Sequence, residues 1–163
     1  MSKLANLADA FYDELQDVYS AEKQLVIAIP KMAKKATCEK LNKALTEHLE
    51  QTQGHVSRIE AAFVDTGKTP TTKKCEAMAG LIKEAEGMMQ KSVDPDVMDA
   101  VLIGLAQKVE HYEIATYGTL CTWAEKLGYT EAKKQLGLNM DEEEKADKLL
   151  TKLSKASNTA AVS

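Results

Sequence analysis

Apolar residues recur at steps of three and four positions through the first part of the chain. This spacing places them on one side of an α-helix and is typical of helices packed in a bundle. It predicts one helix over residues 4–35 that bends at Pro30, because proline has no N–H to donate to the carbonyl four residues back. The apolar positions are Leu4, Ala8, Phe11, Leu15, Val18, Leu25, Ile29 and Met32.

The same period continues along the rest of the chain and is interrupted at turn residues such as Gly128. We expect a helical bundle over residues 1–155 and a flexible C-terminal tail over residues 156–163, whose side chains are mostly small and polar. The further helices are predicted over residues 38–64, 75–90, 96–127 and 130–154.

The links between these segments predict how the helices are connected. They are short within each pair of long helices, and one long connection, which carries the shorter helix, joins the pairs. We therefore expect an all-α four-helix bundle with a single crossover, the ferritin-like arrangement. A chain of 163 residues with 44% hydrophobic content and three prolines fits one such domain.

The charge pattern argues against two classes of partner. The net charge is −4 and lysines are spread among acids, so there is no basic stripe of the kind that binds nucleic acid. The N-terminus has no signal pattern, and no uncharged run reaches the ~20 residues that a membrane span needs. The three cysteines form no CxxC motif, as expected for reduced thiols. We expect a cytoplasmic protein without a nucleic-acid or membrane partner.

Four carboxylates stand where the apolar stripes call for leucine. A charge in the seam of a bundle is costly unless it is compensated, and one metal ion compensates several carboxylates at once. The alternatives are that each acid pairs with a buried Lys or Arg, or that rotated helices leave the acids partly exposed. The four residues are Glu22, Glu113, Glu143 and Asp147.

These acids follow an internal repeat. Glu143 and Asp147 come 30 and 34 residues after Glu113, and Gln51 and His55 come 29 and 33 residues after Glu22. Antiparallel helices joined by a short turn bring such positions to one height, so six groups are expected to converge. Mostly anionic oxygens with one imidazole suit Fe or Mn, with Zn possible, and two ions per chain.

Neighbouring residues leave some roles open. Glu110 is either a further ligand or a solvated charge at the edge of the site, and His55 is either a ligand or a satisfied core histidine. His48 is about two turns from His55, so we interpret it as a hydrogen-bonded core residue. We expect Tyr19 or Tyr117 to donate a hydrogen bond to a carboxylate. His111 is expected at the surface, and Tyr12 is expected to contribute only packing.

Five uncommon sequence motifs are spread over nearly the whole chain. They are Tyr19-Ser-Ala-Glu22-Lys-Gln-Leu25, His48-Leu-Glu-Gln-Thr52, Lys74-Cys-Glu-Ala-Met78-Ala-Gly-Leu81, Val109-Glu-His-Tyr-Glu-Ile114 and Tyr117-Gly-Thr-Leu120. With these motifs the chain resembles the YciE/YciF family of bacterial stress proteins. The resemblance implies a ferritin-like, mostly dimeric protein with a metal centre, linked to general and osmotic stress. A homodimer is therefore expected.

Three functions are consistent with these features. The first is a metal-binding stress protein with a two-ion carboxylate site and oxygen- or peroxide-linked redox chemistry; whether it is an enzyme stays open. The second is a non-enzymatic interaction protein that keeps the bundle, which the neutral Gln51 in place of a carboxylate favours. The third is iron storage in a hollow shell, which ranks last because no mineral-nucleating acidic patch is evident.

Overall fold

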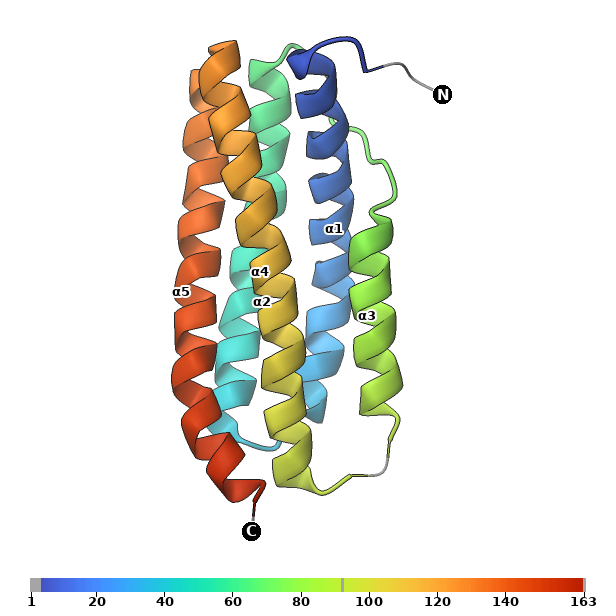
Figure 1. The fold of residues 1–163 in the computed structure, drawn as a ribbon, viewed down its shortest axis with the longest axis vertical. Coiled ribbons are helices and arrows are strands. Elements are labelled where there is room, and N and C mark those ends of the chain that lie inside the picture. Colours follow the sequence, from blue (N-terminus) through green and yellow to red (C-terminus); the bar gives the residue numbers. More distant parts are fainter. Residues whose placement is uncertain (1–3, 92, 163) are drawn as a thin grey trace.

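The computed structural model describes residues 4–91 and 93–162, and this part of the chain contains helices without strands. Four long helices run side by side, and a shorter fifth helix lies along the outside of the bundle against α1 and α4 (Figure 1). The all-α bundle with one long crossover is therefore confirmed. The helices are α1 (Leu7–Lys35), α2 (Glu39–Asp65), α3 (Glu76–Met89), α4 (Pro95–Leu127) and α5 (Thr130–Ala160).

Local chemistry explains where several helices begin and end. The Asn6 side chain accepts a hydrogen bond from the backbone N–H of Asp9 at the start of α1, and Asp94 accepts one from Asp96 at the start of α4. Gly128 ends α4 with φ of 75°, a left-handed conformation that favours glycine. α1 continues through Pro30 to Lys35, so the proline does not break the helix.

The last helix is longer than its sequence pattern predicted. α5 ends at Ala160, whereas we expected it to end near Ser154 and to leave a frayed segment. Residues 155–160 contain no glycine or proline to end the helix, so the helix continues although most of these residues are exposed. The flexibility of the tail over residues 156–163 stays a prediction, and Ser163 lies outside the described residues.

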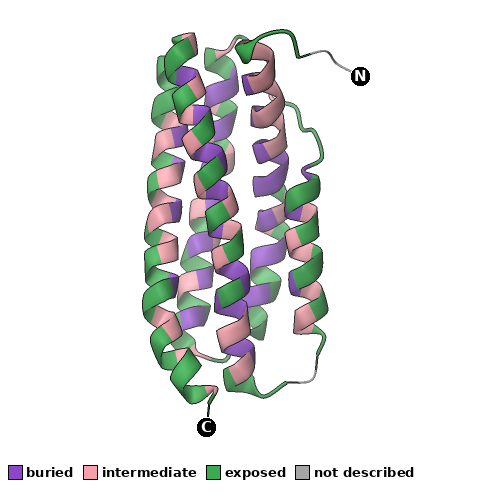
Figure 2. Cartoon of the chain, viewed as in Figure 1, coloured by how far each residue is buried: buried purple, intermediate pink, exposed green. Residues whose placement is uncertain are grey.

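The core consists of two apolar clusters with a polar layer between them. The first cluster contains Phe11, Phe63 and Leu136, and the second contains Met32 and Leu102. On each long helix the buried residues face inward (Figure 2). Along each of these helices, buried polar residues lie close to where the stretch that builds one cluster gives way to the stretch that builds the other. Asp99 on α4 is an exception, because it lies within the stretch of the second cluster. The fold therefore places a polar layer near mid-height of the bundle.

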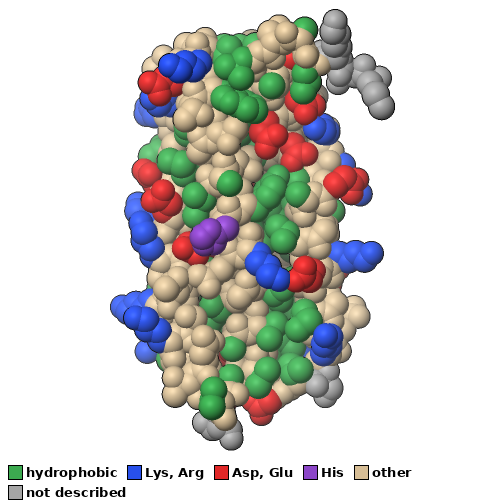
Figure 3. Space-filling view, in the orientation of Figure 1, with side chains coloured by type: hydrophobic (Ala, Val, Ile, Leu, Met, Phe, Trp, Pro, Cys, Tyr) green, Lys and Arg blue, Asp and Glu red, His purple; other side chains and the backbone are tan. Residues whose placement is uncertain are grey.

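The outside of the bundle is mixed in charge. Lys and Arg side chains alternate with Asp and Glu side chains over the face shown in Figure 3. None of the five helices, within residues 4–91 and 93–162, combines the length and apolarity needed to cross a membrane.

Candidate metal centre

The polar layer receives side chains from all four long helices. α1 contributes Glu22, α2 contributes the two histidines, α4 contributes two glutamates one turn apart, and α5 contributes Glu143. All of these side chains are buried, with exposed fractions from 0% to 7%. They are Glu22, His48, His55, Glu110, Glu113 and Glu143.

These six residues form two overlapping groups. Glu22 and His55 make up one end, and His48 and Glu110 make up the other. Glu113 and Glu143 belong to both groups, and within each group the candidate ligand atoms all lie within 4.8 Å of one another. Two carboxylates shared by two sets of ligands are the arrangement expected for a pair of neighbouring ions.

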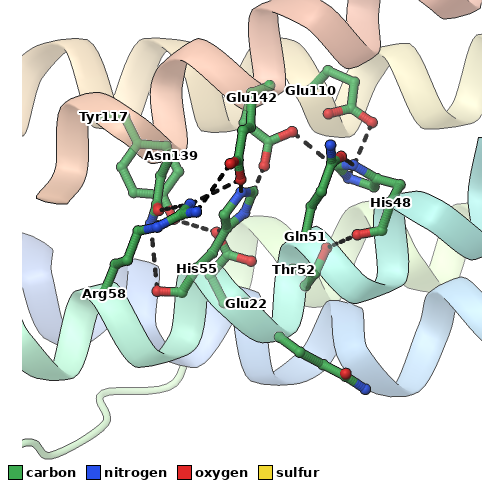
Figure 4. A network of polar contacts seen from close by, with 12 residues as sticks. Glu22, His48, Gln51, Thr52, His55, Arg58, Glu110, Tyr117, Asn139 and Glu142 are labelled. Atoms are coloured by element: carbon green, nitrogen blue, oxygen red, sulfur yellow. Dashed lines mark hydrogen bonds and ion pairs between the residues drawn. The ribbon is translucent and has the colours of Figure 1, made fainter.

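His55 presents one ring nitrogen to each side. Its Nδ1 lies 3.3 Å from Glu22 Oε1 and 2.9 Å from Glu143 Oε1, on the side of the carboxylates. Its Nε2 lies 2.9 Å from Glu142 Oε2, which Arg58 holds through two hydrogen bonds of 2.8 and 2.9 Å (Figure 4). A histidine that donates one N–H to a carboxylate is held with its other nitrogen free to bind a metal.

His48 has the opposite arrangement. Its Nδ1 lies 3.2 Å from Gln51 Oε1, and its Nε2 faces Glu110 Oε1 at 3.5 Å and Glu143 Oε2 at 3.6 Å (Figure 4). Because an amide oxygen can only accept a hydrogen bond, Nδ1 is the donor in this contact, and Nε2 is the ring nitrogen that faces the buried carboxylates. Gln51 thus orients His48, rather than joining the carboxylates directly.

A series of hydrogen-bonded side chains covers the Glu22 end of the layer. Tyr117 is fully buried and donates its hydroxyl hydrogen to Glu22. Asn139 donates to the Tyr117 oxygen at 3.1 Å and accepts from Arg58 at 3.0 Å. One of the two tyrosines expected to donate to a carboxylate of the site, Tyr117, therefore does so. The other, Tyr19, donates to Glu60 at 2.6 Å, away from the layer.

The layer contains many buried polar atoms without a hydrogen-bond partner. A buried carboxylate or imidazole left in this state is costly, and native structures seldom keep one unless it serves a function. His55 Nδ1 is close to Glu143, but the two are not aligned as a hydrogen bond. In the described residues the unpartnered atoms are Glu22 Oε2, His48 Nε2, His55 Nδ1, Glu110 Oε2, and both carboxylate oxygens of Glu113 and of Glu143.

This donor set fits a pair of divalent ions. The unpartnered atoms are oxygens and imidazole nitrogens, which suit Fe, Mn and Zn. They belong to the same six residues that form the two groups of ligand atoms. Two bound metal ions would give these atoms partners and would offset the mutual repulsion of the four carboxylates in the layer.

Protons compensate part of this charge without a metal. Burial raises the pKa of Glu113 well above the ordinary value of 4.5, and the carboxylate of Glu143 raises it further. Burial and Glu143 act in the same way on the pKa of Glu110. Burial lowers the pKa of His55, but the carboxylates of Glu143 and Glu22 outweigh this and raise the pKa to about 10. Ions therefore have to displace protons from these groups.

We expect the metal-free protein to lose stability as the pH rises from about 6 to about 9. The pKa values of Glu110, Glu113 and His55 are all raised by folding. Their stabilising contribution is therefore complete below the unfolded pKa values and is lost as the pH rises through the folded values, near 10 for His55.

Thermal unfolding in the presence of a chelator would measure this trend. The same experiment with added Mn(II) should show a stabilising increment that grows with pH, because fewer protons then compete for the ligands. A metal-free stability that increases over this pH range would contradict the prediction.

The structure brings together most of the residues that the sequence singled out. Glu22, His55, Glu113 and Glu143 meet in one group, and Glu110, left open as an edge charge, is buried in the other. Gln51 lies beside the layer in contact with His48.

Asp147 is the exception. It was predicted to converge with the other ligands, and the structure places it outside both groups. Its Oδ1 accepts a hydrogen bond of 2.9 Å from Gln107 and lies 3.3 Å from His111 Nε2, and it belongs to neither group. A side chain four residues after Glu143 is rotated by roughly 40° around the helix, which turns it toward the edge of the bundle. His111 is 70% exposed there, as expected.

Sequence reasoning missed four residues of the site. His48 was interpreted as a core residue, although it shares a helix face with His55 at a spacing of seven residues. That shared face was the available signal. Glu142, Arg58 and Asn139 come from α2 and α5 and meet only through folding, so no sequence motif identified them.

Comparisons with known proteins identify the family of this chain. The family described as "Domain of unknown function (DUF892)" matches residues 6–163. The chain belongs to this DUF892 family. Protein YciF of Escherichia coli K12 is 45% identical over 151 residues, covering 92% of this chain and 91% of the relative. The predicted resemblance to the YciE/YciF family is thus confirmed.

Solved structures of similar proteins share the DUF892 fold. The E. coli stress protein YciF has a TM-score of 0.92 at 43% identity, covering 96% of this chain and 99% of the other. YcfI from Rhodopseudomonas palustris has a TM-score of 0.89 at 41% identity, covering 91% and 95%. A Xanthomonas campestris protein at 20% identity and a TM-score of 0.77, covering 95% of each chain, is similar in fold alone.

Proposed function

We propose that this DUF892 protein is a ferritin-like metal-binding protein of the bacterial stress response that holds a pair of Fe or Mn ions, with Zn possible. The observation that carries the proposal is the set of unpartnered atoms in the buried polar layer. Those atoms belong to the residues of the two overlapping ligand groups. The stress role comes from the similarity to the E. coli stress protein YciF.

Each residue of the layer has a distinct part in this proposal. Glu22 and the Nδ1 of His55 would hold one ion, and Glu110 and the Nε2 of His48 would hold the other. Glu113 and Glu143 belong to both groups and would serve both ions. A pair of redox-active ions would supply oxygen- or peroxide-linked chemistry when bound.

The surrounding residues prepare the centre for that role. Glu142 and Gln51 fix the two imidazoles through the ring nitrogens that face away from the candidate ligands Glu113 and Glu143. Tyr117 holds the carboxylate of Glu22 and, together with Asn139, excludes water from that end. Rigid, dry surroundings strengthen the attraction between carboxylates and cations.

Elemental analysis of protein purified without added metal, followed by anaerobic titration with Fe(II), tests the proposal. We expect about two ions per chain and consumption of dioxygen or peroxide by the loaded protein. Glu113→Gln removes a carboxylate that belongs to both ligand groups and should bind less metal, and Glu50→Gln is its matched control, because Glu50 is an exposed glutamate of α2. A chain that binds no Fe(II), Mn(II) or Zn(II) would overturn the proposal. Binding without consumption would remove only the redox part.

A non-enzymatic interaction protein of the stress response is the second candidate. Gln51 favours it, because this residue contributes a neutral amide next to His48 where a carboxylate would add charge to the site. A cellular stress phenotype that survives the double variant Glu22→Ala, Glu143→Ala would support this candidate over metal-dependent function. We also propose that the protein is a cytoplasmic homodimer. Size-exclusion chromatography with light scattering would measure its mass in solution.

A further inference from the structure

A groove between α2 and α5 reaches the polar layer from the surface. Its volume is about 100 Å³, and a water molecule needs roughly 10–15 Å³ of such space, so the groove has room for several. Exposed Glu47 and Leu149 lie among its outer residues, while buried His48 and Glu110 also line it. The groove therefore connects solvent with one end of the layer.

The two ends of the layer differ in access. The His48 end opens to the groove, where the exposed fractions of His48 and Glu110 are 7% and 2%. Glu22 and His55 at the other end are fully buried, and the Arg58–Glu142 pair lies outside His55. Figure 4 shows this separation, with His48 and Glu110 gathered at one end of the network and Arg58 near the other.

The groove ends on atoms that lack partners. The Nε2 of His48 and the Oε2 of Glu110 have no hydrogen-bond partner, and both residues are more than nine-tenths buried. The walls leading to them include Ala44 and Ala146, whose short side chains leave the passage open. A small cation that passes the exposed Glu47 and Lys145 would meet an imidazole nitrogen and a carboxylate oxygen at the buried end of the groove.

We propose that the groove between α2 and α5 is the path by which divalent cations reach the buried centre, with His48 and Glu110 as the first groups that bind them. This inference rests on the proposed metal centre. On this path the two ends of the layer bind ions at different rates, because an ion that binds Glu22 and His55 first has to pass the His48 end.

Blocking the groove without touching a ligand tests this path. Ala146→Phe fills the passage from α5, and Ala115→Phe is the matched control, because Ala115 is exposed on α4 near the level of Glu113 and does not line the groove. Stopped-flow absorbance would follow Co(II) uptake by the metal-free protein. We expect uptake by Ala146→Phe to slow by roughly tenfold or more, since a conformational opening then precedes binding.

Equilibrium measurements separate the path from the centre itself. After long incubation, Ala146→Phe should hold as many Co(II) ions as the wild type, and Ala115→Phe should load at the wild-type rate. Uptake by Ala146→Phe at the wild-type rate would overturn the proposed path while leaving the metal centre intact. A wild-type protein that binds no Co(II) at equilibrium would instead overturn the centre.

A second variant covers the case in which the larger side chain prevents folding. Ala146→Cys is a small change, and benzyl methanethiosulfonate can block the groove after folding by forming a mixed disulfide. Uptake should slow on labelling and recover when dithiothreitol removes the label. Ala115→Cys, treated in the same way, also controls for labelling of the native cysteines. Equal rates in labelled and unlabelled Ala146→Cys would overturn the path.

Discussion

Glu113→Gln is expected to yield a metal-free protein more stable than the wild type, which no longer gains stability when metal is added. Glu113 is fully buried, neither of its carboxylate oxygens has a hydrogen-bond partner, and it belongs to both groups of ligand atoms. Glutamine keeps the volume, removes the ionisable group, and offers an amide N–H₂ to Glu22 or Glu143. The gain should be about 1–3 kcal/mol, the cost of an unsatisfied buried polar group.

The loss of metal binding should be the larger effect. In the wild type, free Mn(II) at a hundredfold excess over its dissociation constant should add about 2.7 kcal/mol for one site, assuming no binding to the unfolded chain. That corresponds to a rise in melting temperature of roughly 5–10 °C for a chain of this size. Glu113→Gln removes a residue that serves both ions, so this rise should disappear. Thermal unfolding followed by circular dichroism measures both effects.

Glu50→Gln controls for the change of residue type, because it makes the same substitution at an exposed position of α2. Its stability and its response to Mn(II) should match those of the wild type. The opposite pattern would count against a metal centre. If Glu113→Gln were destabilised without metal and still gained stability from Mn(II), the buried acids would serve the fold and the ions would bind elsewhere.

The helices were predictable because their signal is local. The spacing of apolar residues extends over several turns, and it placed the ends of α1, α2, α3 and α4 within about three residues of those observed, an uncertainty usual for helix boundaries predicted from sequence. The same pattern carried the main clue to the site. Glu22, Glu113 and Glu143 each interrupt an apolar stripe, and all three are fully buried.

The errors within the site arose from side-chain directions. His48 and His55 are seven residues apart, a rise of about 10.5 Å along a helix, which suggested that they could not share a site. Their rings lean toward each other, so the ring centroids are 6.4 Å apart. Asp147 shows the converse, since its backbone level was expected to suit the site but its side chain contacts Gln107 instead. Register along a helix can be counted in a sequence, whereas the direction of one long side chain depends on its neighbours.

Contacts between distant segments were beyond the sequence pattern. Asp99 is 2% exposed on α4, yet no motif marks it as important. Its carboxylate accepts three hydrogen bonds from the link between α1 and α2: from Thr37 N at 2.8 Å, from Thr37 Oγ1 at 2.6 Å and from Cys38 N at 2.7 Å. The position before α2 has no side-chain cap of its own. A residue some 60 positions away therefore supplies the cap.

Asp99→Ala is accordingly expected to lower the free energy of unfolding by roughly 2–4 kcal/mol, because three hydrogen bonds to a charged acceptor are lost. The melting temperature should fall by roughly 5–15 °C. Asp96→Ala is the matched control in the same helix, since Asp96 is exposed in the first turn. Its loss should cost no more than about 1 kcal/mol, the usual worth of an acid near a helix N-terminus.

The response of Asp99→Ala to metal distinguishes a structural cap from a part of the centre. Asp99 lies in neither group of ligand atoms, and its bonds go to the α1–α2 link at one end of the bundle. The variant should therefore be less stable than the wild type but should gain as many degrees from Mn(II). Both proteins would start from different melting temperatures and show the same increment. A reduced increment would mean that the link between α1 and α2 sets the positions of the ligands, because those two helices carry Glu22 and both histidines.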